Sequence, residues 1–525
     1  MSRLITKYGV YLSIAVYLAL FLLTLNWYQF SFDVDGTAYM TIAKKMYEGA
    51  WYRSINGLWS PLNSFIASFC IKQSANPAIS FKIINAVCCT GIIATTAALL
   101  KRFIQNNLLI AGIFSALPFI LLSWTHQQLA GDLLSLFFML LYLNLITSKD
   151  FFTKPSYNIY AAVIMALAYL AKSFCLPFFI INHIIIHLWY QHNNKSIINT
   201  KYIVSRIIIS FSVFFLMAIG WIYCLYLKYN KLTFSTAGNL NYNWFLGNGP
   251  ATQKDFGLLL PPPYPDSHNF WEDPYSYYNN FYGPLSSFSN FLKAIKLIFH
   301  NIKESVFVFT EISFTLMGVF VYWIIRLIKS NQKEKYFSIS LLLISSIVLV
   351  TGYLLIHIET RYIWLTAVVG LILGAKILEE KVLPYLHNKS LSLTIFLLFI
   401  GSFLLSPADK LLNLRYSGKD VYEAADFLST KNIKGNFTSN YTTNAQNSWC
   451  TNLAFLSHNG FFLLSKNDYS QSELIDAIRQ DNIRFYLFFY NNTMEKENFL
   501  TTPLAKAAKQ IIHIPGKDVL LILLQ

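Results

Sequence analysis

Residues 11–27 read YLSIAVYLALFLLTLNW, and the sequence FDVDGTAY follows at residues 32–39. The apolar run is long enough to cross a bilayer as a helix, and no small-residue cleavage site follows it. It is therefore predicted to be a retained membrane anchor and not a cleaved signal. The two aspartates come directly after this anchor, at the depth of the lipid headgroups.

The composition of the whole chain also indicates a membrane protein. Of its 525 residues 55% are hydrophobic, 17% aromatic and 13% charged, whereas soluble globular proteins carry about 25% charged residues. Lys and Arg number 41 against 26 Asp and Glu, a net charge of +15. The basic residues lie between apolar runs and not in polar clusters, so no nucleic-acid partner is predicted. The cysteines predict no disulfide framework, because all but Cys450 lie in or beside apolar runs.

Apolar stretches near the length of a membrane span recur along the chain. They lie at about 8–28, 78–100, 106–124, 128–147, 157–171, 174–190, 203–227, 305–328, 336–356, 361–379 and 391–407. In hydrocarbon every backbone amide needs an internal hydrogen bond, so these stretches are predicted to be helices. The short stretch at 157–171 is compatible with a broken or half-inserted helix. We expect a polytopic all-α membrane domain of about eleven transmembrane helices over residues 1–407.

Basic residues in the short connections predict the sidedness of this domain. With the N-terminus in the cytoplasm, the inner side holds Arg3, Lys7, Lys101, Arg102, Lys149, Lys154, Lys195, Lys201, Arg206, Arg326, Lys329, Lys333, Lys335, Lys376, Lys381 and Lys389. The short outer turns hold only Lys172 and Arg361. This bias predicts a multi-pass protein of the cell (inner) membrane with a cytoplasmic N-terminus.

Three long segments then face outward: residues 29–77, residues 228–303 and residues 408–525. Nucleotide sugars and ATP are cytoplasmic, so a site on the outer side needs another activated donor. Segment 228–303 is rich in Trp, Tyr and Asn, which suits either a carbohydrate or acceptor surface or a belt at the membrane interface. In 408–525, strand-like runs alternate with helical ones, which predicts a small extracytoplasmic α/β domain that covers the site or recruits the acceptor.

In the first outer segment, the apolar positions 39, 42, 43, 46 and 47 have the spacing of an amphipathic helix. Proline at 61 favours a second short helix, and both are expected to lie in the interface with their apolar faces against lipid. Two roles remain open for the aspartates. Asp35 is either the N-cap of the first helix, or the general base for an acceptor hydroxyl, with Asp33 as the second candidate. A metal-binding Asp-x-Asp fits poorly on a side without nucleotide sugars.

The stretch Asp35-Gly36-Thr37-Ala38-Tyr39, with Ile42-Ala43, Gly49 and Trp59-Ser60-Pro61-Leu62, resembles the first outer loop of the GT-C glycosyltransferases. This superfamily of polytopic enzymes uses polyprenyl-phosphate sugars and includes lipid A aminoarabinose transferases and protein O-mannosyltransferases. The resemblance implies that Asp35 is catalytic. The sequence departs from the family pattern at Gly36, where a Glu is common, and at Ala38, where some members have Arg.

Three further motifs support the resemblance. Gly131-Asp132-Leu133-Leu134 is similar to an acidic motif of the family, Ala168–Ser173 to its Lys-bearing turn, and His357-Ile358-Glu359-Thr360-Arg361-Tyr362 to its Glu-x-Arg-Tyr element. Their charged residues fall at the outer ends of spans, where ionisable groups are expensive and point to function. Lys172, Arg361 and Arg53 are expected to hold the donor phosphate, unless the first two only extend to the headgroups. The supporting residues are Glu359, Asp132 and His357.

The sequence therefore predicts an inverting glycosyltransferase that moves a sugar from a polyprenyl-phosphate carrier to a lipid, glycan or protein hydroxyl of the cell envelope. Beyond this lipid-linked donor no cofactor is expected, and no metal. Two other classes stay open. A lipid or sugar transporter would show paired halves and broken helices near mid-membrane, and a non-catalytic subunit of envelope-glycan assembly would use the outer loops for docking.

Overall fold

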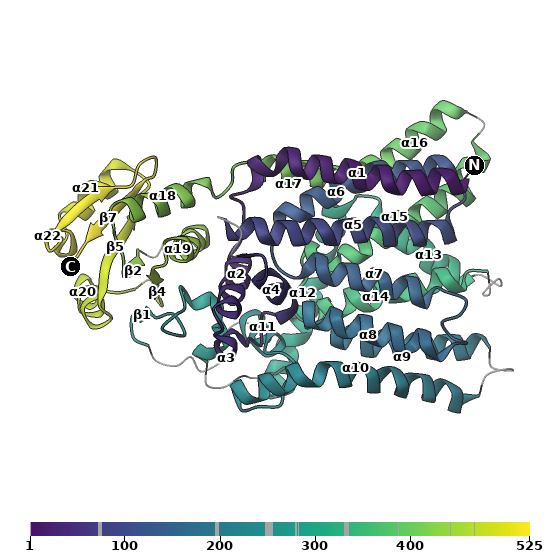
Figure 1. The fold of residues 1–525 in the computed structure, drawn as a ribbon, viewed down its shortest axis with the longest axis horizontal. Coiled ribbons are helices and arrows are strands. Elements are labelled where there is room, and N and C mark those ends of the chain that lie inside the picture. Colours follow the sequence, from purple (N-terminus) through teal and green to yellow (C-terminus); the bar gives the residue numbers. More distant parts are fainter. Residues whose placement is uncertain are drawn as a thin grey trace.

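The computed structural model consists of a bundle of long helices with a smaller α/β domain at one end (Figure 1). It describes residues 2–71, 76–194, 199–246, 256–278, 281, 283–329, 335–386, 388–440, 443–466 and 468–524, with backbone only for residues 2–7. The N-terminus and the α/β domain lie at opposite ends of the bundle. An odd number of crossings would produce this arrangement.

Apolar helices form the bundle and share one hydrophobic core. They are α1 (Ser2–Tyr28), α5 (Pro77–Phe103), α6 (Asn107–Gln127), α7 (Asp132–Ile146), α8 (Pro155–Ala171), α9 (Cys175–Asn193), α10 (Thr200–Tyr229), α13 (Leu316–Lys329), α14 (Phe337–Leu354), α15 (Trp364–Ile377) and α16 (Lys389–Ser402). Among the described residues, six helices are long and apolar enough to cross a membrane, or up to eight if each of two bent pairs counts as one. The polytopic helical architecture is confirmed, whereas the number of eleven spans stays a prediction.

The predicted span at 305–328 is wrong as a single helix. Its first part belongs to α12 (Phe288–Ile312), and α13 leaves it at an angle of 112°. At the break, Ser313 has an extended backbone, and its hydroxyl lies 2.6 Å from that of Ser402 on α16. One side of α12 exposes a stripe of large apolar residues, including Phe288, Phe299 and Phe307. Such an amphipathic helix suits the membrane interface better than a span.

The end of the bundle next to the α/β domain is covered by short elements from three segments of the chain. These are α2 (Val34–Tyr47), α3 (Trp51–Ser54), α4 (Pro61–Ser68), α11 (Ala237–Phe245), β1 (Leu259–Leu260), η2 (Phe270–Glu272), η3 (Pro274–Tyr277) and η4 (Thr360–Ile363). The expectation that the apolar face of α2 contacts lipid is wrong, because Tyr39, Ile42 and Met46 are buried in the core. On α4, by contrast, Phe65 is exposed.

The α/β domain contains a five-stranded sheet of order β3-β2-β5-β7-β6. Its strands are β2 (Asn436–Ser439), β3 (Gly460–Phe461), β5 (Ile483–Phe489), β6 (Gln510–His513) and β7 (Val519–Leu523). β2 is parallel to β3 and β5, and β7 is antiparallel to β5 and β6. The remaining short elements of the chain are η5 (Leu378–Val382), η6 (Leu383–Tyr385), α17 (Leu405–Leu414), α18 (Lys419–Thr430), α19 (Asn444–Ser457), β4 (Leu463–Leu464), α20 (Gln471–Gln480), α21 (Thr493–Leu500) and α22 (Pro503–Lys506).

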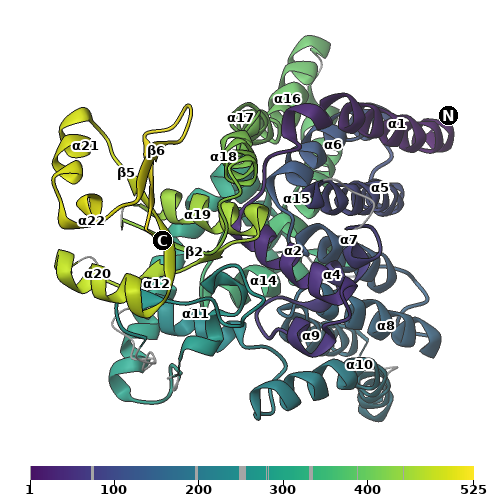
Figure 2. The same ribbon diagram turned by 60° about the vertical axis from the view of Figure 1, so that its left-hand side comes forward.

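The α/β domain is attached to this end of the bundle at several points. In Figure 2, α18 and α19 lie between the sheet and the helices of the bundle. The hydroxyl of Thr37 on α2 donates to the side-chain oxygen of Asn452 on α19, at 2.6 Å. Strand β4 pairs antiparallel with β1, which belongs to the segment between α10 and α12. These contacts fix the domain next to the helix that carries Asp35.

Gly418 supports this attachment and is open to a direct test. It has a φ of +79°, and a Cβ at this position would lie 2.5 Å from the carbonyl oxygen of Phe30. We expect Gly418→Ala to cost roughly 1–3 kcal/mol and to lower the apparent melting temperature of the detergent-purified protein, measured by tryptophan fluorescence. Gly401→Ala, where nothing lies within 4 Å, is the control and should melt like the parent. Equal melting of both variants would contradict this role of Gly418.

Candidate active site

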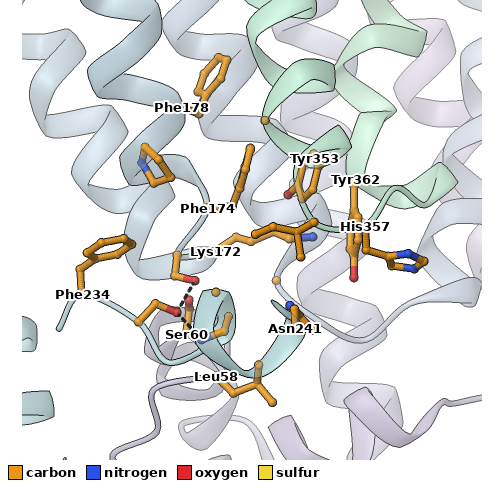
Figure 3. A pocket seen from close by; sticks show the side chains of 18 of the residues that line it. Leu58, Ser60, Lys172, Phe174, Phe178, Phe234, Asn241, Tyr353, His357 and Tyr362 are labelled. Carbon is orange, nitrogen blue, oxygen red and sulfur yellow. Dashed lines mark hydrogen bonds between the residues drawn. The ribbon is translucent and has the colours of Figure 1, made fainter. Parts of the chain in front are cut away.

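One cavity of about 410 Å³ lies where these short elements meet the ends of the bundle helices. Asp35, Asp132, Lys172, His357 and Arg361 all line it, so most of the predicted site residues come together. Figure 3 shows Lys172 extending across this cavity toward Tyr353 and Tyr362. The opposite wall is apolar and comes from the spans α9 and α14. It includes Pro177, Phe178, Ile181, Val348 and Leu355.

The two aspartates of the first loop have separate roles in the structure. Asp33 is the N-cap of α2, and its Oδ1 accepts a hydrogen bond of 2.9 Å from the amide of Gly36. Asp35 is therefore not the cap, and its carboxylate lines the cavity in the first turn of α2, with 8% of the residue exposed. Burial and the neighbouring Asp35 raise the pKa of Asp33, against the opposing charge of Arg361.

The departures from the family pattern in this loop have a structural reason. A Cβ at Gly36 would lie 2.9 Å from Oδ1 of Asp33 and 3.1 Å from Cβ of Leu129. A side chain at this position would therefore disturb the N-cap. Ala38 is buried in the core and supplies no positive charge to the cavity. The cations of the cavity therefore come from other segments.

Arg361 forms the centre of the charged cluster. Its Nη1 lies 2.8 Å from Oδ2 of Asp35 and 3.8 Å from Oδ2 of Asp33, and its Nε lies 2.7 Å from Oε2 of Glu359. Nη1 also donates to Oε1 of Gln128 at 2.8 Å. The planar guanidinium can serve several oxygens at once, so Arg361 joins the first outer loop to the turn before α15.

Glu359 holds Arg361 from the side away from the cavity. Its second oxygen lies 3.1 Å from Nε2 of His357, whose ring stacks on Phe245 with centroids 4.3 Å apart. Although burial opposes the effect, contacts with His357 and Arg361 lower the pKa of Glu359 to about 2. The contacts with His357 and Arg361 thus favour the anionic form of Glu359, which orients the guanidinium.

Lys172 is the second cation of the cavity. It follows the last residue of α8, and its ammonium group pairs with Oδ1 of Asp132 in the first turn of α7. The ammonium also lies 4.2 Å from the centre of the Tyr362 ring. A helix C-terminus favours a cation and a helix N-terminus favours an anion. The pair therefore complements the two helix ends that meet here.

Arg53 does not belong to this cluster, which corrects the expectation that it binds the donor phosphate. Its side chain is 51% exposed, does not line the cavity, and pairs with Asp266 at 3.4 Å. The sequence pattern placed Arg53 near the membrane surface but did not indicate in which direction it points. Lys172 and Arg361 are the cations that line the cavity.

The sequence did not predict several contacts of the site. Nε1 of Trp271 donates to Oδ1 of Asp35 at 3.0 Å. The two residues after Trp271 each belong to a buried ion pair. Glu272 pairs with Lys45, and Asp273 pairs with Lys228. The signal for these contacts in the sequence was that acidic residues stand next to aromatic ones in segment 228–303. Their partners lie in distant segments, so the sequence alone did not pair them.

No family model and no curated protein matches the chain by sequence. The archaeal oligosaccharyltransferase AglB of Archaeoglobus fulgidus, in complex with Zn and sulfate, is 13% identical, with a TM-score of 0.58 over 92% of this chain and 68% of that chain. ArnT from Cupriavidus metallidurans, bound to undecaprenyl phosphate, is 10% identical, with a TM-score of 0.54 over 98% and 97%. Both are GT-C proteins, so the fold implied by the resemblance is confirmed.

The contact between α7 and α8 that supports the Lys172–Asp132 pair can be tested. A Cβ at Gly131 would lie 2.3 Å from the carbonyl oxygen of Ala171, so Gly131→Ala has to separate the two helix ends. We expect a lower apparent melting temperature of the detergent-purified protein, measured by tryptophan fluorescence. Gly238→Ala, with open space around its Cβ, should melt like the parent. Unchanged melting of Gly131→Ala would show that the contact is dispensable.

Proposed function

We propose that the chain is an inverting glycosyltransferase that transfers a sugar from a polyprenyl-phosphate carrier to an acceptor hydroxyl. The observation that carries this proposal is the division of one cavity into two chemical ends. A carboxylate and two cations, from Asp35, Lys172 and Arg361, line one end, and apolar side chains such as Phe178 and Ile181 line the other. A ligand with a phosphate head and a hydrocarbon tail matches both ends.

In the proposed reaction Asp35 accepts the proton of the acceptor hydroxyl while the oxygen attacks the anomeric carbon of the sugar. A bond forms between this oxygen and the carbon. The bond from the carbon to the phosphate oxygen breaks, and polyprenyl phosphate leaves with the electron pair. This single displacement inverts the anomeric configuration. Lys172 and Arg361 stabilise the charge that the phosphate gains, and Glu359 and Asp132 hold these cations in place.

A metal ion does not fit the residues of this cavity. Zinc is present in one AglB structure. In the part of this chain that the structure describes, however, no three His, Cys, Asp or Glu side chains come together as a metal site. Asp35 and Asp132 each face a cation of the protein itself. We propose a reaction without a metal ion and without a cofactor beyond the lipid-linked donor.

The partners and the location are proposed from the neighbours and from the charge distribution. AglB has been solved with dolichol-phosphate and an inhibitory peptide, and ArnT with undecaprenyl phosphate. We assign to this chain a polyprenyl-phosphate sugar as donor and a lipid, glycan or protein hydroxyl as acceptor. The proposed location is the cell (inner) membrane, with the N-terminus cytoplasmic and the cavity and α/β domain on the outer face.

The two aspartates provide a matched pair of variants for the reaction. Asp35→Asn keeps the shape of the side chain but removes the base, so we expect loss of product by at least about a hundredfold. Asp33→Asn retains an oxygen that can cap α2 and should keep most of the activity. The measurement is mass spectrometry of envelope glycans and glycolipids. The cells lack the parent protein and express one of the two variants in its place.

The opposite result would change the mechanism. An active Asp35→Asn with an inactive Asp33→Asn would move the base to Asp33. Two fully active variants would refute a carboxylate base in this loop.

The orientation in the membrane can be tested by labelling single cysteines with a membrane-impermeant maleimide in intact spheroplasts. In a background without the partly accessible Cys70 and Cys224, we expect Glu423→Cys on α18 to react and Lys154→Cys, between α7 and α8, to react only after permeabilisation. Both parent side chains are exposed, by 61% and 58%. The reverse pattern would place the cavity on the cytoplasmic side and contradict the proposed donor.

A further inference from the structure

The carboxylate of Asp35 is held on both oxygens. Oδ2 faces Nη1 of Arg361 at 2.8 Å, and Oδ1 accepts the indole N–H of Trp271 at 3.0 Å. Arg361 lines the cavity, whereas Trp271 is not among its lining residues. The indole therefore reaches Asp35 from behind the cavity wall and is placed to act on the carboxylate and not on a ligand.

The indole of Trp271 has little freedom to move. Its ring stacks on that of Trp244 with centroids 5.3 Å apart and planes at 11°. Its backbone oxygen accepts a hydrogen bond of 3.2 Å from Nε1 of Trp59, and its backbone N–H donates to the side chain of Asn269 at 2.9 Å. Side chain and backbone of Trp271 are thus both fixed.

The two residues after Trp271 attach its segment to the bundle. Glu272 pairs with Lys45 of α2, and Asp273 lies 3.0 Å from Nζ of Lys228 at the end of α10, with all four side chains buried. Buried ion pairs are a weak means of adding stability because desolvation opposes them, but they require defined geometry. Two such pairs next to one another suit a segment whose position has to be accurate.

The α/β domain holds the same segment from the other side. Leu259 and Leu260 of β1 pair with Leu464 and Leu463 of β4. The amide of Phe461 also donates to the carbonyl oxygen of His268 at 2.8 Å. Residues 256–278 are therefore a strap between the bundle and the α/β domain, and Trp271 is the residue of this strap that contacts Asp35.

We infer that Trp271 is a positioning residue for Asp35, and that the α/β domain contributes to catalysis by holding the strap that carries it. With Trp271 and Arg361 on its two oxygens, the carboxylate is fixed about its side-chain torsions, and the acceptor hydroxyl meets an oriented base. Loss of the N–H frees one oxygen to rotate away from the acceptor hydroxyl. This inference rests on the proposed function, because it requires Asp35 to be the base.

The test is Trp271→Phe, which keeps an aromatic ring against Trp244 but removes the N–H donor. Rates are measured with the purified full-length protein and polyprenyl-phosphate sugars extracted from the native cells, with product quantified by mass spectrometry. We expect kcat to fall by about tenfold or more, with an unchanged apparent KM for the lipid donor and unchanged affinity for undecaprenyl phosphate. Trp449→Phe is the matched control, since this indole donates to Asp420 in the α/β domain at 2.9 Å, and its kcat should equal that of the parent.

Each outcome decides the inference. An unchanged kcat in Trp271→Phe would overturn it while Asp35→Asn remains inactive, so the proposed function would stand. A loss of donor affinity or of melting temperature in proportion to the loss of kcat would assign Trp271 a structural role only, and also overturns it. An active Asp35→Asn would instead remove the proposed base, and with it both proposals.

Discussion

The ion pair between Asp35 and Arg361 is the interaction on which the outer half of the molecule depends. Without Arg361, Asp35 would be an uncompensated charge in a largely buried site, which is strongly destabilising, whereas Arg361 has Glu359 as a second partner. Asp35 comes from the helix after the first span, and Arg361 from the turn before α15. The pair therefore fixes the distance between the first outer loop and one of the last helices of the bundle.

Other contacts are arranged around this pair in a consistent way. Glu359 and Gln128 orient Arg361, Asp33 caps the helix that presents Asp35, and Trp271 holds the remaining carboxylate oxygen. The Lys172–Asp132 pair adds a second cation where α7 and α8 meet. A polar cavity with fixed charges thus borders directly on an apolar wall from the spans. This combination supports an amphiphilic phosphate ligand and distinguishes the site from a simple lipid-facing groove.

The sequence predicted what is encoded locally and missed what depends on long-range packing. Apolar runs identified the helices of the bundle, and the motifs around Asp35, Lys172 and Arg361 predicted residues that share one cavity. The pattern could not show that Arg53 points away, or that the predicted span at 305–328 breaks at Ser313. In residues 408–525, strand-like runs predicted strands, and the structure has a sheet there. The two-residue strand β3 has no period to detect.

The wide sequence separation of the charged partners has a consequence for biosynthesis. In the proposed orientation Asp35 reaches the outer surface after the first span has been inserted, long before the ribosome has made Arg361. The carboxylate has to stay hydrated during this interval, because no guanidinium is yet present to compensate its burial. The helix around Asp35 can therefore settle into its final place only after the later spans have entered the bilayer. Maturation of the site is in this way coupled to the completion of membrane insertion.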